Sequence, residues 1–170
     1  MLEKIIKENI MLGVEKMNKK KMKDGIKVQG FFRIQLGKCG KVVGDSGWQK
    51  NTVVNLGFQD YICKSIGALA GSKIVSHMQL GTGTEPDATD TSLQGETRAR
   101  KTTSNSVVSS KTLRSTASWS SSDNTANVTL QNIGLFNTSA GGTLACGNTY
   151  ATSQWQSNQD VSATYELRFS

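Results

Sequence analysis

The sequence predicts a mainly β protein: an antiparallel, jelly-roll-like β-sandwich with one short helix in its body and an N-terminal amphipathic helical arm. Hydrophobic residues make up 36% of the chain, which also has 17 Gly and 1 Pro, a composition typical of short strands joined by polar turns. About seven or eight segments alternate between apolar and polar residues. The 170 residues fit one domain with an attached arm, since domains cluster at roughly 100 to 150 residues. This composition excludes an all-α enzyme.

Net charge divides the chain into a basic arm and a neutral body. Residues 1–41 hold 11 Lys and Arg against 4 Asp and Glu, whereas residues 42–170 hold 9 of each. A nucleic-acid-binding domain would spread its positive charge over a folded face. We therefore divide the chain into a basic helical arm (1–25), a strand and linker (26–47) and a β-sandwich domain (48–170), and we expect neither nucleic acid nor a membrane as partner.

Apolar residues recur at intervals of three and four along the first 23 residues, as on one face of a helix. This apolar stripe consists of Leu2, Ile6, Ile10, Val14 and Met17. An isolated helix of this length is marginal in water, so we expect the stripe to face another chain; the alternative is that it folds back on its own body. The lysine-rich run at 19–23 is typical of a solvated helix end. The less favoured alternatives are that it contacts an acidic protein, nucleic acid or a membrane.

Two strands and a helix are predicted next. Residues 26–36 alternate with period two and predict a strand, 37–47 form a turn-rich link, and 48–55 form a short extended piece. Asn55 is typical of a helix N-cap, and Gly71 closes the helix. The apolar face expected on this helix is Phe58, Ile62, Ile66 and Leu69.

The centre of the body is rich in Ser and Thr, which make up 15 of the residues 102–129. Alternation over 112–119 nevertheless predicts a strand rather than a disordered stretch. Its inward face is Leu113, Ser115, Ala117 and Trp119. A turn at Asp123-Asn124 is expected to make a hairpin with the strand that follows. Further strands are expected at 74–80, 92–101, 102–110, 133–136 and 143–146.

The clearest strand is the last one, over residues 161–169. Its apolar face is Val161, Ala163, Tyr165, Leu167 and Phe169. We expect this strand to close the core and to bury Phe169.

Candidate catalytic and metal-ligating residues are few. The one histidine, His77, lies in an alternating segment, which favours a structural or surface role over catalysis or metal ligation. The run 81–84 lacks the lysine and the following helix of a phosphate loop, so it is expected to be a tight turn. Asp87 and Asp90 lack the spacing of a helical calcium hand and are expected to be solvated turn acids. We therefore expect no catalytic residue, cofactor or metal site.

The cysteines and the hydropathy of the chain indicate the cell compartment in which the protein is made. Cys39, Cys63 and Cys146 are too few and too far apart for a disulfide framework or a zinc site, and they are expected to be buried reduced thiols. Charged residues fall within 3–8, where a signal peptide needs an apolar run, and no stretch approaches 18 apolar residues. The protein is expected to be made in a cytosol-like compartment.

The three tryptophans are the candidates for sugar stacking. Trp119 is in phase with Leu113 and Ala117, so it is assigned to the core. Trp155 lies among polar residues in a segment expected to be a loop or an edge. It is therefore the exposed aromatic favoured for a ligand or partner contact.

Six short segments keep a fixed order and spacing through the body. They are Trp48–Phe58, Met78–Pro86, Asp90–Leu93, Glu96–Arg98, Asn132–Phe136 and Gly142–Leu144. In this order they resemble a group of small structural proteins of tailed bacteriophages. The resemblance spans about residues 48–169 and leaves the arm outside. It implies a non-enzymatic virion part with a β-sandwich body, of the kind described as tail, fibre-associated or capsid-surface proteins.

The resemblance implies a virion protein assembled in the host cytoplasm, with other virion structural proteins as partners in a homo-oligomer or symmetric assembly. Such assemblies use arms to tie neighbours together, because an amphipathic helix buries its stripe only when a partner supplies a groove. The alternative is a receptor- or glycan-binding β-sandwich with a host-surface glycan as partner. A small hydrolase, which would need a positioned base, is the third hypothesis.

Overall fold

The computed structural model describes residues 25–84 and 86–170. The stripe expected on the arm, Leu2, Ile6, Ile10, Val14 and Met17, lies outside the described residues. The described part is mainly β, with all strand pairs antiparallel and one short helix in the body, as the sequence predicted. In this part of the chain, no helix is long and apolar enough to cross a membrane.

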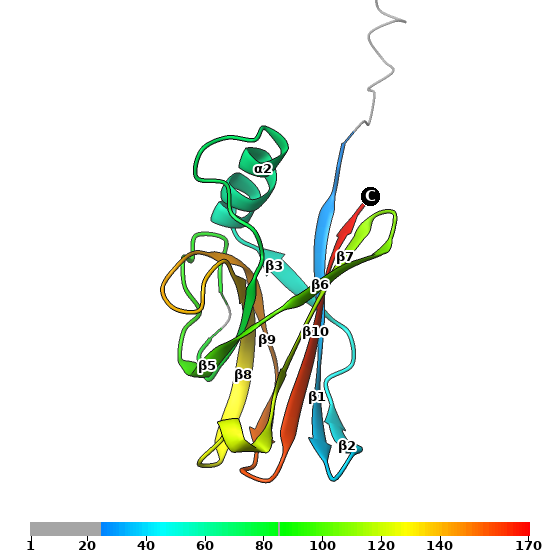
Figure 1. The fold of residues 1–170 in the computed structure, drawn as a ribbon, viewed down its shortest axis with the longest axis vertical. Coiled ribbons are helices and arrows are strands. Elements are labelled where there is room, and N and C mark those ends of the chain that lie inside the picture. The colour runs from blue at the N-terminus through cyan, green and yellow to red at the C-terminus, as the bar shows by residue number, and fades with distance from the viewer. Residues whose placement is uncertain (1–24, 85) are drawn as a thin grey trace, which may run out of the picture.

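Ten strands and a few helical turns make up the fold (Figure 1). The strands are β1 (Val28–Lys38), β2 (Lys41–Asp45), β3 (Gln49–Val53), β4 (His77–Gly81), β5 (Glu96–Thr102), β6 (Ser104–Ser109), β7 (Thr112–Trp119), β8 (Val128–Phe136), β9 (Leu144–Trp155) and β10 (Asp160–Phe169). The helix begins as the π-helical segment η1 (Gly57–Cys63) and continues as α2 (Lys64–Ile66). A 3-10 turn, η2 (Ser121–Asp123), follows β7.

Nine strands form one hydrogen-bonded series in the order β5-β4-β8-β9-β3-β1-β10-β7-β6, and β2 pairs with β1. β3 joins the two halves of this series, because Asn51 pairs with Gly30 of β1 while Thr52 pairs with Gly147 of β9. The edge strands β5 and β6 are consecutive in the chain, and Thr103 between them donates its N–H to the carbonyl of Ser76 at 2.8 Å. The sheet therefore curls into a nearly closed barrel.

The core lies inside this curl and follows the alternation of the strands. Phe32 of β1, Leu130 of β8 and Trp119 of β7 belong to one cluster of buried side chains. The inward face of β7 is the predicted one from Ser115 to Trp119, whereas Leu113 is only half-buried. The fold thus confirms the period-two assignment of these strands.

The last strand confirms its prediction except at its end. Val161, Ala163, Tyr165 and Leu167 are buried, but Phe169 is only half-buried. The expectation that Phe169 is buried is therefore wrong. β10 pairs along its length with β1 and β7. Phe169 nevertheless remains partly exposed, because it lines two open grooves at the end of the strand.

The hairpin expected at Asp123-Asn124 is wrong. β7 pairs with β6 and β10, whereas β8 pairs with β4 and β9, so the two strands never meet in the sheet. η2 redirects the chain through a capping box between Ser120 and Asp123, and buried Asn124 donates to the carbonyl of Trp155 at 3.0 Å. The turn is a crossover between the two halves of the sheet. The link expected at 37–47 likewise contains a strand, β2.

A helix forms within the predicted range, but the expected limits are wrong: its N-cap is Leu56 rather than Asn55, and it ends at Ile66 rather than at Gly71. Its apolar stripe also does not face the core. Phe58, Ile66 and Leu69 are exposed. Gly57 is buried instead, and a Cβ at this position would overlap the carbonyl oxygen of Ala145 in β9. Close approach at the start of the helix thus sets its orientation and leaves the stripe outward.

Cysteine burial is confirmed for Cys146 only. Burial raises the pKa of the Cys146 thiol to about 11. Cys39 and Cys63 are exposed free thiols, so their expected burial is wrong. Cys39 lies in the turn between β1 and β2 with a φ of 51°, and Cys63 ends the π-helical segment.

Candidate functional site

Trp155, the aromatic expected to be exposed, is fully buried. Its ring belongs to the main core cluster, and its Nε1 donates to the carbonyl of Gln159 at 2.7 Å. The polar residues around it belong to β9 and to the tight turn before β10, so Trp155 is the inward residue of a polar-looking strand. The prediction of an exposed Trp155 is wrong.

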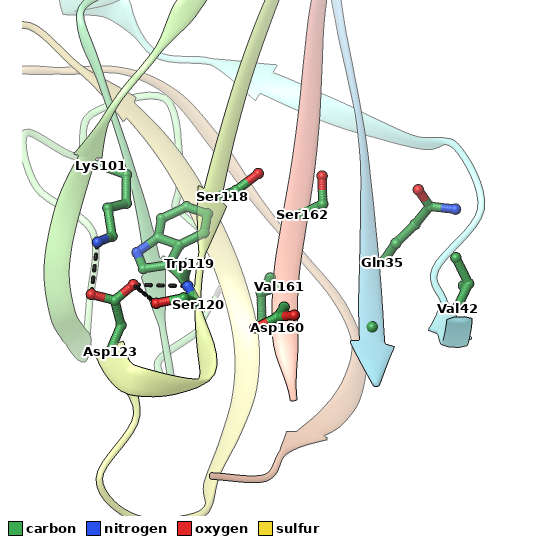
Figure 2. Close-up of a pocket in the computed structure, with 11 residues that line it drawn as sticks. Gln35, Val42, Lys101, Ser118, Trp119, Ser120, Asp123, Asp160, Val161 and Ser162 are labelled. Carbon is green, nitrogen blue, oxygen red and sulfur yellow. Dashed lines mark hydrogen bonds and ion pairs between the residues drawn. The ribbon is translucent and has the colours of Figure 1, made fainter. Parts of the chain in front are cut away.

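A polar pocket of about 530 Å³ opens where β1 and β7 end and β10 begins (Figure 2). Three polar residues from adjacent strands lie in one row along its wall, since Gln35 pairs with Ser162 and Ser162 pairs with Ser118. An amide and two hydroxyls offer both hydrogen-bond donors and acceptors. This row suits a neutral ligand rich in hydroxyl groups.

An ion pair forms another wall of the polar pocket. Lys101 Nζ lies 2.7 Å from Asp123 Oδ1, and the other carboxylate oxygen accepts the N–H of Ser120 at 2.8 Å. The hydrogen bond from Lys101 holds the pKa of Asp123 below its usual value, although burial opposes this. Asp160 is fixed as well, because its Oδ1 accepts the N–H of Ser121 at 2.7 Å. Lys101 and Asp123 are therefore engaged with each other, whereas Asp160 is held by a backbone amide.

An apolar groove of about 320 Å³ lies at the opposite ends of β1, β7 and β10. We call it the Phe169 groove. It is lined mainly by Tyr61, Ile62, Ile74, Leu113, Leu167 and Phe169. Two smaller apolar depressions continue it, one beside Val107 and one beside Ile26, and both include Phe169 and Lys111. Phe169 is thus the centre of an apolar surface that runs from the helix to the start of the described chain.

A charged cluster holds the helical wall of the Phe169 groove. Buried Asp60 accepts from Lys64 at 2.7 Å and also pairs with Lys73. Hydrogen bonds from Lys64 and Lys73 lower the pKa of the Asp60 carboxyl against the opposing effect of burial. Lys73 also donates to Thr143 Oγ1 at 2.7 Å, and the hydroxyl of Tyr61 donates to the carbonyl of Thr143. These bonds fix the groove in the folded body.

Large apolar side chains around the Phe169 groove are open to solvent. Ile26 is 82% exposed, and Ile74 and Val107 are each 75% exposed. The start of β1, the C-terminal residue and α2 all lie at this end of the body (Figure 1). The residue at which the arm joins the body is therefore next to the largest group of exposed apolar side chains beside a groove.

The other candidates found in the sequence take ordinary structural places. His77 begins β4, and its Nδ1 lies 2.8 Å from the hydroxyl of Ser76. Asp87 accepts from the N–H of Thr89 at 2.7 Å, and Asp90 accepts from the N–H of Asp87 at 2.8 Å. Within residues 25–84 and 86–170, no three His, Cys, Asp or Glu side chains are grouped as a metal site would require.

Sequence reasoning did not find either surface. The residues of the polar pocket are single polar positions in three strands, and only the register of the strands brings Gln35, Ser118 and Ser162 together. The Phe169 groove left no signal in the sequence either, because Ile74 falls in the segment 74–80 that was expected to be a strand, whereas β4 begins only at His77.

In comparisons with protein-family models, curated proteins and solved structures, no match was found. The functional proposal therefore draws on the chemistry of the two surfaces, on the apolar stripe in the sequence of the arm and on the resemblance of the six body segments.

Proposed function

We propose that the protein is a structural subunit of a tailed-bacteriophage virion, at the tail, neck, fibre attachment or capsid surface, anchored to other virion proteins by its N-terminal arm. The observation that supports this most is the exposed apolar surface at the end of the body where the arm begins. Together with the apolar stripe of the arm, it gives this end two apolar surfaces that need a protein partner. The phage assignment itself rests on the resemblance of the six body segments.

The energetic case for a partner follows from exposure. Burying a Val or Ile side chain that is otherwise exposed contributes about 1.5 to 3 kcal/mol. Ile26, Ile74 and Val107 are mostly exposed, so a partner that covers them gains several such contributions. Soluble proteins rarely leave such groups uncovered when they form a contiguous patch. A protein interface is the use that this chemistry supports.

The jelly-roll-like sandwich expected from sequence belongs to this proposal. It is supported by the packing of strands from the two halves of the series against each other, as Phe32 of β1 and Leu130 of β8 share one core cluster. A body of this kind offers two outer faces and two ends. The Phe169 groove and Ile26, near the first described residue, lie at one of these ends.

The test compares particles carrying two arm variants. We expect Ile6→Asp with Ile10→Asp to lower incorporation of the protein into particles at least tenfold, because both charges fall on the apolar stripe. Lys4→Gln with Asn18→Asp makes the same change in net charge at positions off the stripe and should leave incorporation unchanged. The measurement is the amount of this protein in gradient-purified particles. Equal incorporation of both variants would refute the anchoring role of the arm.

A receptor- or glycan-binding module is the second candidate, and the polar pocket favours it. Hydroxyl and amide groups in a row beside an ion pair match the hydroxyl groups of a sugar. We expect a glycan array probed with the full chain to show binding that Ser162→Leu abolishes, if this candidate is correct. Binding that survives Ser162→Leu, or no binding at all, would remove it.

A further inference from the structure

We propose that the Phe169 groove of one copy binds residues 1–24 of a second copy of this chain. The inference rests on the proposed anchoring role of the arm and names its partner, a neighbouring copy. It also assigns the surface that receives the arm, which the sequence alone does not indicate.

The groove has the chemistry that an apolar helix face requires. Tyr61, Ile62 and Leu113 are half-buried around it, and Leu167 forms part of its floor. Ile74 at its rim is 75% exposed. Peptide helices dock into such grooves through residues spaced three and four apart.

The arm supplies a matching occupant. Twenty-four residues precede Gly25, and the described chain begins beside the depression formed by Ile26 and Phe169. The stripe from Leu2 to Met17 would extend over roughly 22 Å as a helix, and it presents an apolar residue at every turn. No other apolar segment of the chain lies outside the described body.

Charge favours the groove of a neighbour over the groove of the same copy. The lysine-rich run 19–23 separates the stripe from Gly25. The run lies within seven residues of Ile26, which shares a depression with Lys111, so an arm folded onto its own body would keep these lysines close to Lys111. Like charges repel at this short range. In the groove of a neighbour the run can stay in solvent, while Glu3, Glu8 and Glu15 of the arm approach the groove lysines.

An arm that docks in a neighbouring groove makes a head-to-tail contact. Each copy then gives one arm and receives one, so the contact repeats until a ring closes or a filament grows. The arm is therefore a device for assembly from identical copies.

The experiment uses two full-length variants that are deficient on opposite sides of the contact. The arm variant carries Ile6→Asp and Ile10→Asp; the groove variant carries Ile74→Asp and Val107→Asp, both at exposed positions that tolerate charge. The matched control places the same two charges on exposed Val42 and Val43 of β2, at the other end of the body. Each variant is checked for a cooperative thermal transition and is then studied by sedimentation velocity.

We expect the unmodified chain and the β2 control to associate, and the arm and groove variants to remain monomeric when alone. An equal mixture of the two monomeric variants should form 1:1 dimers, because the intact arm of one fits the intact groove of the other. A mixture that stays monomeric would overturn the proposal, as would a groove variant that associates like the unmodified chain. If the groove variant does not fold, Ile74→Asp alone replaces it in the same mixture.

These outcomes separate the inference from the proposed function. Loss of 1:1 pairing with normal dependence of particle incorporation on the arm would refute the groove as receptor and leave the anchoring role intact. If the two variants pair in solution but the arm variant is incorporated into particles normally, the groove is supported as receptor of the arm and the anchoring role in the particle is refuted.

Discussion

The two ends of the body differ in chemistry although the same strands reach both. Where β1 and β7 end and β10 begins, polar side chains line a pocket, in which Lys101 pairs with Asp123 and Asp160 accepts a backbone N–H. At the other end, half-buried Phe169 of β10 is surrounded by three exposed apolar residues from outside these strands: Ile26 before β1, Ile74 before β4 and Val107 of β6. Both ends expose apolar side chains, Val42 and Val43 of β2 at the first, but only at the second end do they surround an apolar groove and the depressions beside it. The difference shows that the pairing of the strands does not determine which side chains they expose at their ends.

The largest expected loss of stability comes from truncating Trp119, a core residue beneath the polar pocket. Trp119 is fully buried under that pocket, and its Nε1 donates to the carbonyl of Ala99 at 3.0 Å. Trp119→Ala should lower the free energy of unfolding by about 3 to 5 kcal/mol, as for other large buried aromatics. Urea denaturation measures this. Trp48→Ala, at a 42% exposed tryptophan, is the control and should cost far less; an equal loss would show that the core assignment is wrong.

At the apolar end, truncation should cost less because Phe169 is only half-buried. Phe169→Ala should lower the free energy of unfolding by about 2 kcal/mol, roughly half the cost at a fully buried aromatic. Phe32→Ala, at a fully buried residue of the paired strand β1, provides the full-cost reference in the same denaturation assay. Equal losses for the two variants would contradict the half-open character of this end.

Glu166, on the outer face of β10 between the two ends, makes a pH-dependent contribution to the free energy of unfolding. Glu166 is buried and accepts from Arg114 at 2.6 Å and from Arg168 at 2.6 Å. Burial alone would raise the pKa of Glu166, but the hydrogen bonds from the two arginines outweigh it, so this pKa lies below the usual 4.5. The stabilisation is therefore present above the unfolded pKa and is lost as pH falls through the lower folded pKa.

Glu166→Gln should remove this contribution. We expect a loss of about 1 kcal/mol at pH 7, because the arginine heads can regain water. Thermal unfolding followed from pH 7 to pH 3 should show the difference between variant and unmodified chain shrinking at the acid end. A difference that stays constant with pH would show that the pKa of Glu166 is the same in the folded and the unfolded chain, and would contradict its lowering by the two arginines.

The smallest effect is expected at the ion pair of the polar pocket. Lys101 and Asp123 are partly exposed, so Lys101→Ala should cost only about 0.5 kcal/mol and less at high salt. Asp123→Ala should cost more, because Asp123 also accepts the N–H of Ser120 in the capping box. Thermal unfolding of both variants at low and high salt tests this order, and the reverse order would contradict the capping role.

The sequence was sufficient for features that depend on local pattern. Alternation in β7 and β10 identified their inward residues because a strand that is buried on one face must alternate. Alternation does not identify the partner of a strand, and this is why a hairpin was expected between β7 and β8, which lie in different halves of the sheet. Strand pairing depends on contacts distant in sequence, and those leave no local signal.

The errors at single residues share a physical cause. Trp155 has polar neighbours in sequence, yet it points inward because β9 places it opposite Val128 in β8. The stripe containing Phe58 and Ile66 has ideal helical spacing, yet Gly57 brings the other side of the helix against β9. Orientation is set by the neighbouring strand in both cases. The polar pocket and the Phe169 groove could not be predicted from the sequence for the same reason, since each is formed by residues that only the packing of distant segments brings together.

Cross-linking with mixed isotopes tests the difference between the two ends most directly. Equal amounts of unlabelled and 15N-labelled full-length chain are mixed and treated with an amine-reactive cross-linker, and linked peptides are identified by mass. We predict links between Lys4, Lys7 or Lys16 of the arm and Lys111 beside the Phe169 groove, with unlabelled arms joined to labelled grooves. Links to Lys111 only within chains of one label, or arm links only to Lys101 at the polar pocket, would contradict the assembly of this protein through its apolar end.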